Sequence, residues 1–180
     1  MATKVCRQRK TMIINDNLIT LDDFKKAQEK NKYFDDSRWG YIKEIIDIVK
    51  PLNLNGRVLE MGSEGLTIVK NCDTMNKVID TPDLTYYQDA VKTPYPIYDK
   101  KYCLFIACQV WEHFECYHHW VFREVMRISE RAILTFPYMW KNTHWTHDNI
   151  DMKKIAEWTY NVPMKLNKQI GSRMLCYWEF

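Results

Sequence analysis

A glycine-containing turn after a short strand-forming run is the most specific chemical feature of this sequence. The run reads Val58-Leu59-Glu60-Met61-Gly62-Ser63-Glu64-Gly65. A strand that ends beside a ligand must turn sharply, and residues without a Cβ allow such a turn. Ligands of doubly wound sheets bind at the carboxyl ends of the strands. We therefore expect a ligand site at Gly62, in which Asp80, 20 residues after Glu60, binds ribose hydroxyls. The alternative is a plain glycine-containing loop that follows a strand.

Histidines form a second group of residues that could do chemistry. His113 follows one apolar run, while His144 and His147 follow the next, so all three belong to the ligand side of the sheet. A neutral imidazole suits a general base that removes a proton from an acceptor hydroxyl. We predict that His113, His144 or His147 is this base. The alternative is that His113 only caps or packs against the next helix.

The same region also contains potential metal ligands. Imidazoles and carboxylates both bind transition metals. The candidates are Glu112, Glu115, His118, His119, His144 and His147. A solvated, histidine-rich loop explains His118 and His119 more simply, and no Cys-x-x-Cys pair is present, so we predict no metal site.

Aromatic residues offer contacts for an acceptor, because their rings stack on flat molecules and sugars. Tyr138, Trp140 and Trp145 follow Pro137, outside any predicted strand, and we expect them to bind the acceptor. Trp120 and Phe122 lie in a predicted helix, and we expect both to fill the core.

Charge and composition limit the classes of partner. The 180 residues carry a net charge of +3, far from the dense basic surface of a dedicated nucleic-acid binder. A small-molecule acceptor is therefore expected, without nucleic acid and without a membrane. The basic residues between Lys4 and Lys10 are expected to form a solvated arm. No long apolar run follows them, so we predict no secretory signal, reduced cysteines and a cytoplasmic protein.

Helices and strands alternate along the predicted elements. Helices are expected over residues 20–30, 36–50, 117–129 and 151–160. Strands are expected over 57–61, 77–80, 84–87, 102–108 and 131–136, with a hairpin over 164–180 that turns at Gly171-Ser172. Residues 11–14 are either an irregular arm or a short edge strand. This order predicts an N-terminal arm over 1–20 and a single α/β domain over 21–180.

Several of these segments, in this order, resemble class I S-adenosylmethionine-dependent methyltransferases. Residues 58–65 resemble their first motif, and residues 105–114 (Phe-Ile-Ala-Cys-Gln-Val-Trp-Glu-His-Phe) look like their fourth strand and its exit. Residues 133–138 resemble the fifth strand with a Pro-Tyr exit. The resemblance extends from about residue 36 to the C-terminus, and the Glu-His pair with the histidine-rich loop is similar to small-molecule and sugar O-methyltransferases. It implies a Rossmann-like, seven-stranded, mostly parallel sheet with helices on both faces and a C-terminal antiparallel hairpin.

The resemblance also implies the roles of individual residues. Glu60 and Gly62, with Ser63 and Gly65 in the same turn, would hold the methionine end of S-adenosylmethionine. Asp80 would bind the ribose, Asp89 and Ala90 would flank the adenine, and Gln109 and Val110 would line the sulfonium side.

Two departures from the family pattern bear on cofactor binding. Glu64 and Leu66 occupy positions where the family has glycines, and few residues separate the turn from the second strand, which leaves little room for a crossover helix.

The resemblance predicts methyl transfer to an oxygen or nitrogen of a small acceptor, such as a sugar. The alternatives are an inactive, methyltransferase-like binding module and a metal-assisted methyltransferase acting on RNA.

Overall fold

The computed structural model describes residues 11–77, 84–141 and 147–180. Seven strands form the main sheet, in the order β5-β4-β3-β6-β7-β9-β8. Neighbouring strands from β5 to β7 are parallel, and β9 pairs antiparallel with both β7 and β8. The strands are β3 (Val58–Met61), β4 (Asp73–Asn76), β5 (Tyr86–Tyr87), β6 (Leu104–Cys108), β7 (Arg131–Pro137), β8 (Leu166–Ile170) and β9 (Arg173–Glu179). The predicted mixed sheet with a C-terminal hairpin is thus confirmed.

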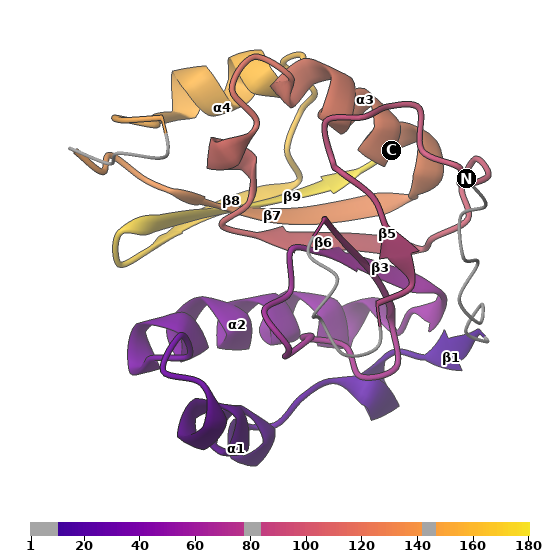
Figure 1. Ribbon diagram of the computed structural model, residues 1–180, viewed down its shortest axis with the longest axis vertical. Helices are drawn as coiled ribbons and strands as arrows, with labels where there is room; N and C mark the ends of the chain where they lie inside the picture. Colours follow the sequence, from indigo (N-terminus) through magenta and orange to yellow (C-terminus); the bar gives the residue numbers. More distant parts are fainter. Residues whose placement is uncertain (1–10, 78–83, 142–146) are drawn as a thin grey trace.

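Helices cover both faces of the sheet (Figure 1). On one side lies α2 (Asp36–Val49), with α1 (Leu21–Lys30) beyond it. On the other side lie α3 (His118–Ile128) and α4 (Met152–Trp158). All four helices were expected from the sequence, with ends that differ by a few residues.

The central strands are buried on both faces, as their nearly continuous apolar sequence predicts. In β6, Leu104 and Ile106 pack in one apolar cluster with residues of α2, while Phe105 and Ala107 pack in the other with residues of α3 and α4. Phe122 of α3 is fully buried in this second cluster, as expected, whereas Trp120 is 53% exposed. The expectation for Trp120 was wrong because only one side of α3 faces the sheet.

The connection from β3 to β4 contains no helix. Residues 63–72, which are all described, form only bends, turns and an isolated bridge. The second strand occupies Asp73–Asn76 rather than the expected 77–80, so Lys77 directly follows it and residues 78–83 lie outside the described part. The strand was predicted at the wrong place because three of the four residues of β4 are polar, and the burial of Asp73 and Thr74 is not visible in the sequence pattern.

The N-terminal segment packs on the molecule before α1 begins. Strand β1 (Met12–Ile13) pairs antiparallel with β2 (Asn55–Gly56) in a separate two-stranded sheet, which agrees with the short edge strand considered for this region. Ile14 is fully buried, and the 3-10 helix η1 (Asn15–Asn17) leads on to the segment before α1. None of the helices among the described residues has the length and apolar character of a membrane span.

Candidate functional site

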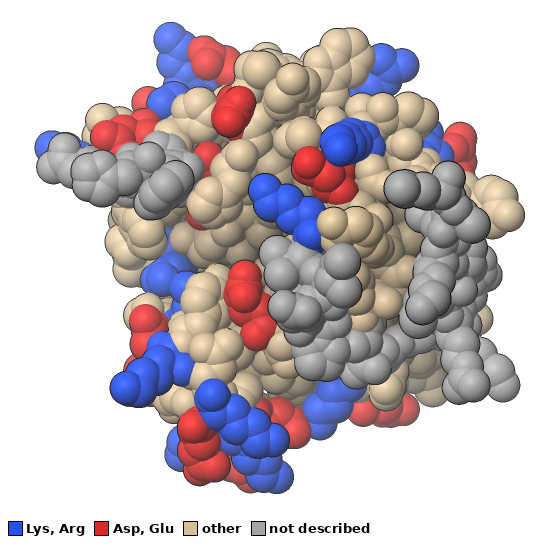
Figure 2. Space-filling view, in the orientation of Figure 1, with Lys and Arg blue, Asp and Glu red and all other residues tan. Residues whose placement is uncertain are grey.

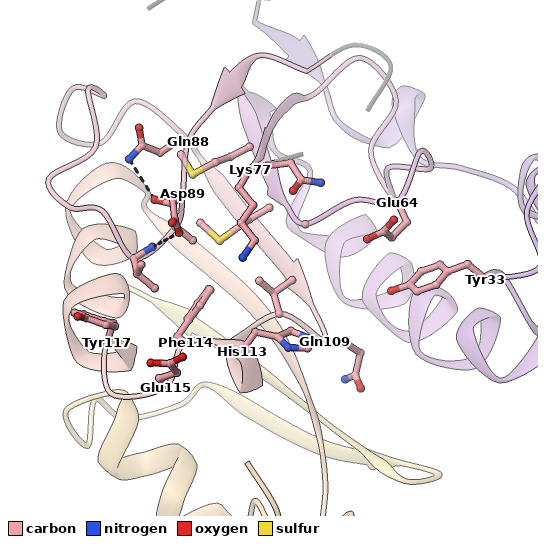
Figure 3. A pocket seen from close by; sticks show the side chains of 17 residues that line it. Tyr33, Glu64, Lys77, Gln88, Asp89, Gln109, His113, Phe114, Glu115 and Tyr117 are labelled. Carbon is pink, nitrogen blue, oxygen red and sulfur yellow. Dashed lines mark hydrogen bonds between the residues drawn. The ribbon is translucent and has the colours of Figure 1, made fainter. Parts of the chain in front are cut away.

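A cavity of about 650 Å³ opens at the carboxyl ends of β3, β4 and β6 (Figure 3). This volume lies within the usual range for cofactor and small-molecule sites. The elements that meet there come from distant parts of the sequence: the loop between α1 and α2, the turn after β3, the end of β4, the segment after β5 and the turn after β6. The cavity therefore lies where the sequence predicted a ligand site.

Five of the predicted site residues line this cavity: Gly62, Asp89, Ala90, Gln109 and His113. Val110, expected on the sulfonium side, lines it as well.

Gly62 permits the turn that brings the chain to the cavity wall. Its φ is +73°, a conformation that disfavours residues with a Cβ. A Cβ built at this position would also lie 2.5 Å from Cγ2 of Val110. The glycine is thus required both by the backbone conformation and by the close approach of the turn after β6.

The backbone at the end of β6 also takes an uncommon conformation. Gln109 has φ of +56°, and Glu115, a few residues later, has φ of +51°. Both residues line the cavity. The amide of Gln109 is fixed by a hydrogen bond from its Nε2 to Oγ1 of Thr135, at 3.2 Å.

The charges around the cavity are mainly negative. Glu64, Asp89 and Glu115 line the described walls, opposed by Lys77, whose side chain points into the cavity (Figure 3). Oδ1 of Asp89 accepts a hydrogen bond from the backbone N–H of Val91 at 3.3 Å, which orients the carboxylate. This arrangement favours a ligand that carries positive charge.

Three other described residues predicted to hold the cofactor, Glu60, Ser63 and Gly65, do not line this cavity. The Glu60 carboxylate is buried and accepts a hydrogen bond from the backbone N–H of Ile68 at 2.8 Å, so it fixes the loop that follows the turn. Burial raises its pKa to about 8. Ser63 lines a small hollow behind the main cavity, and Gly65 lines a groove beside α1. Asp80 lies outside the described residues.

A pair of proton-accepting side chains lies at the turn after β6. His113 is half-exposed, and its Nε2 lies 4.0 Å from Oε1 of Glu112. Glu112 is 5% exposed, and burial raises its pKa to about 7, close to the value that suits a general base at neutral pH. From the sequence, Glu112 was predicted only as a candidate metal ligand, because a Glu-His pair does not reveal the burial of its carboxyl group.

The remaining histidines are arranged around Trp158. His118 is 2% exposed and stacks on the Trp158 ring, with centroids 3.8 Å apart, and burial lowers its pKa to about 3. The expectation that His118 is solvated was therefore wrong: its position in α3 turns it toward the core. His147 lies 4.9 Å from the His118 ring and hydrogen-bonds the carbonyl of Glu115 at 2.9 Å. His144 lies outside the described part of the chain.

The two described acceptor contacts, Tyr138 and Trp140, lie outside the cavity lining. Tyr138 packs against the core at the end of β7, and Nε1 of Trp140 donates a hydrogen bond to the carbonyl of Ser172 at 2.8 Å. Trp145 is not described. In the described ranges, no group of three or more His, Cys, Asp or Glu side chains is placed to bind a metal ion.

Comparison with solved structures relates this architecture to methyltransferases, whereas no family model and no curated protein matches the sequence. One match is a chain of the complex between the Haloferax volcanii Trm112 methyltransferase activator and a methyltransferase: TM-score 0.59, 12% identity, covering 89% of this chain and 97% of that one. The chain has the fold of class I methyltransferases.

Two further matches differ in what their descriptions say of their function. A Thermotoga maritima S-adenosylmethionine-dependent methyltransferase, described as a possible histamine N-methyltransferase, has a TM-score of 0.56 and 10% identity, covering 88% of this chain and 98% of that one. A chain of the Pnkp1/Rnl/Hen1 RNA repair complex has a TM-score of 0.55 and 14% identity, covering 82% of this chain. This chain spans 42% of the length of that longer one. The same fold therefore occurs in proteins of different function, and the function must be argued from the site.

Proposed function

We propose that this protein transfers a methyl group from S-adenosylmethionine to an oxygen or nitrogen of a small acceptor. The cavity at the carboxyl ends of β3, β4 and β6 carries this proposal, since Gly62, Asp89, Ala90 and Gln109 meet there. Its volume is sufficient for a nucleoside-sized ligand. Its mainly negative walls match a cofactor with a sulfonium group and a net positive charge.

Each wall of the cavity has a distinct role in this proposal. Asp89 and Ala90 flank the adenine, and the turn at Gly62 borders the methionine end. Gln109 and Val110 lie beside the sulfonium centre. Asp80 remains the predicted ribose ligand.

Methyl transfer requires the protein to position the acceptor and to accept one proton. S-adenosylmethionine supplies an electrophilic methyl group, and in-line positioning of the acceptor accounts for most of the catalysis. The acceptor's lone pair forms the new bond to carbon while the carbon–sulfur bond breaks, and the acceptor's proton must then leave. His113 takes this proton at the edge of the cavity, with buried Glu112 beside it to stabilise the imidazolium. His144 and His147 remain alternative bases.

Calorimetric titration of the purified chain with S-adenosylmethionine and S-adenosylhomocysteine tests the proposal. We expect binding, and we expect Asp80→Ala to weaken it by about 1.5–3 kcal/mol, the range for a hydrogen bond to a charged group. Asp22→Asn, at an exposed acid on α1, is the matched control and should leave the affinity unchanged. Unchanged affinity in Asp80→Ala would remove Asp80 from the site.

Absence of binding in the unaltered chain would favour the alternative of an inactive binding module. Glu64 lines the cavity at a position where the family has glycine, and its carboxylate would repel the methionine carboxylate. If Glu64→Gly then gained cofactor affinity, this carboxylate would be the cause of the loss.

The second candidate is methylation of RNA with the help of a metal, favoured by the structural similarity to a chain of an RNA repair complex. Against it, Lys and Arg are interspersed with Asp and Glu on the face shown in Figure 2, and the described residues form no broad basic surface on that face. Titration with and without a chelator distinguishes the two functions, together with an assay of methyl transfer to RNA at defined divalent-metal concentrations.

A further inference from the structure

A buried arginine pairs with the carboxyl end of β7, on the side of the sheet where the cavity opens, without a role in the fold described above. Arg173, the first residue of β9, is 9% exposed. Its guanidinium carbon lies 5.2 Å from the centre of the Tyr41 ring and 5.7 Å from that of Trp140. These cation–π contacts hold the plane of the group. Nε of Arg173 is buried without a hydrogen-bond partner among the described residues.

A second arginine shares one of these aromatic neighbours, Tyr41, and connects the group to the cavity. Nη1 of Arg38, in the first turn of α2, donates a hydrogen bond to the Tyr41 hydroxyl at 3.3 Å. Its guanidinium lies 3.6 Å above the Tyr33 ring, and Tyr33 lines the cavity. Nε of Arg38 is also buried, with no partner in the described part of the chain. Both arginines therefore have an unused donor beside Tyr41.

Glu112 is a candidate for their structural partner, and it does not use these donors. The positive charges of Arg173 and Arg38 both act on its carboxylate. Yet Oε2 of Glu112, like both Nε atoms, is buried without a partner among the described residues. A buried donor without a partner costs about 1–3 kcal/mol, and more when it is charged. Two arginines placed only to neutralise Glu112 would be expected to bond to it directly.

Building on the proposed function, we propose that the acceptor carries an anionic group, a phosphate or a carboxylate, that binds the guanidinium of Arg173 beside that of Arg38. A guanidinium presents its N–H donors in a planar fork that matches two oxygens of either anion. Aromatic rings fix the plane of Arg173, so little order must be gained on binding. The anion would anchor the acceptor next to Glu112 and His113, where its proton must be removed.

Binding of inorganic phosphate and of acetate tests this assignment, with the full chain saturated by S-adenosylhomocysteine and the ionic strength held constant with chloride. We expect one of the two anions to bind at millimolar concentration, and its identity separates a phosphorylated from a carboxylated acceptor. Arg173→Gln should weaken this binding at least tenfold. Arg173→Lys, which keeps the charge but loses the fork, should weaken it less and guards against a loss caused by misfolding. Arg123→Gln, at an exposed arginine of α3, should have no effect.

The same samples separate this inference from the proposed function. S-adenosylhomocysteine affinity should stay within twofold in Arg173→Gln. An equal loss of cofactor and anion affinity would assign the guanidinium to the methionine carboxylate and overturn the inference. So would anion binding that is absent from the unaltered chain or insensitive to both Arg173 variants. If S-adenosylhomocysteine does not bind at all, the proposed function fails, while the anion titration without it still tests Arg173.

Discussion

Different contacts hold the strands in place in the two halves of the sheet. In the half formed by β6, β7, β9 and β8, strands of five to seven residues pack against α2 on one face and α3 and α4 on the other. In the half formed by β3, β4 and β5, strands of two to four residues follow one another, with no helix in the described parts of their connections. The cavity lies where the two halves meet. The half with β6 to β9 is thus stabilised mainly by apolar packing against helices. The half with β3, β4 and β5 needs further contacts that hold its strands and loops in place.

Some of these further contacts are buried polar contacts along β4. Nη2 of Arg57 lies 2.6 Å from Oδ2 of Asp73, which also accepts a hydrogen bond from the Tyr102 hydroxyl at 2.9 Å. Thr74 and Thr85 exchange two hydrogen bonds between backbone N–H groups and side-chain hydroxyls. These contacts place β4 and the residues before β5 without a crossover helix.

The N-terminal segment provides a second set of contacts, at the loop that replaces the first crossover helix. Ile19 and Lys70 donate backbone hydrogen bonds to the carbonyls of Ile68 and Asn17, at 3.0 and 2.6 Å. Nζ of Lys70 lies 2.7 Å from Oδ2 of Asp23 in the first turn of α1. Residues before α1 thus hold residues 68–70 from outside the sheet.

Asp73→Ala should produce the largest loss of stability among the changes considered for the half without helices. It leaves the partly buried Arg57 charge without its buried partner, and we expect the free energy of unfolding to fall by about 3 kcal/mol, measured by urea denaturation. Glu44→Ala, which removes a more exposed ion pair with Lys168, is the control and should cost less than about 1 kcal/mol.

Joint replacement of the buried pair by apolar residues sharpens this test. Arg57→Met with Asp73→Leu should recover most of the loss, because no charge is then left unpaired. Equal costs for Asp73→Ala and Glu44→Ala would contradict the idea that polar contacts stabilise this half.

Sequence patterns were informative where apolar packing determines the structure. The four helices, β6, β7 and the hairpin were all predicted, since their apolar periodicity or continuity records the faces that they bury. In the other half, β4 consists of Asp-Thr-Met-Asn, and its burial depends on partners from Arg57 and Thr85 that are distant in sequence. The strand was accordingly placed four residues too late.

The candidate site shows the same division. Gly62, Asp89, Ala90, Gln109 and His113 came from motifs that follow strands, and they meet in one cavity. Arg38 and Arg173 belong to no such motif, and their convergence on Tyr41 depends on the packing of α2 against the hairpin. Glu60 was predicted to face the cofactor, but its hydrogen bond to Ile68 depends on the unusual loop.

The pH dependence of stability tests the role of Glu60 in that loop. Its folded pKa of about 8 lies above the ordinary value of a carboxyl group, so the folded state binds this proton more tightly than the unfolded state. Its contribution is therefore complete below the ordinary pKa and is lost as the pH rises through about 8. The slope from one such group is at most about 1.4 kcal/mol per pH unit.

Glu60→Gln should flatten the decline in the free energy of unfolding between about pH 5 and pH 8, measured by denaturation at several pH values. Glu112, with its own raised pKa, contributes a similar decline in both proteins and cancels in the difference. Glu29→Gln, at an exposed position of α1, should retain the full slope. An unaltered slope in Glu60→Gln would show that the carboxyl group is not buried as described.

The smallest expected effect concerns the contacts between the segment before α1 and residues 68–70. Its measurement distinguishes local from global stabilisation. Thr20 caps α1: its Oγ1 accepts a hydrogen bond from the N–H of Asp23 at 3.2 Å, and Asp23 accepts one from the N–H of Thr20 at 2.8 Å. Thr20→Ala should lower the free energy of unfolding by about 1 kcal/mol. It should also release Asp23 from its position beside Lys70.

Hydrogen exchange of individual amides identifies which parts of the structure lose stability in Thr20→Ala. The Ile19 and Lys70 amides join the two segments, so their protection should fall in Thr20→Ala more than that of amides in β7 and β9. This outcome means that residues before α1 act as the local substitute for the absent crossover helix. Equal loss of protection in β7 and β9 would mean instead that α1 stabilises the whole domain, and the two halves would then unfold as one cooperative unit.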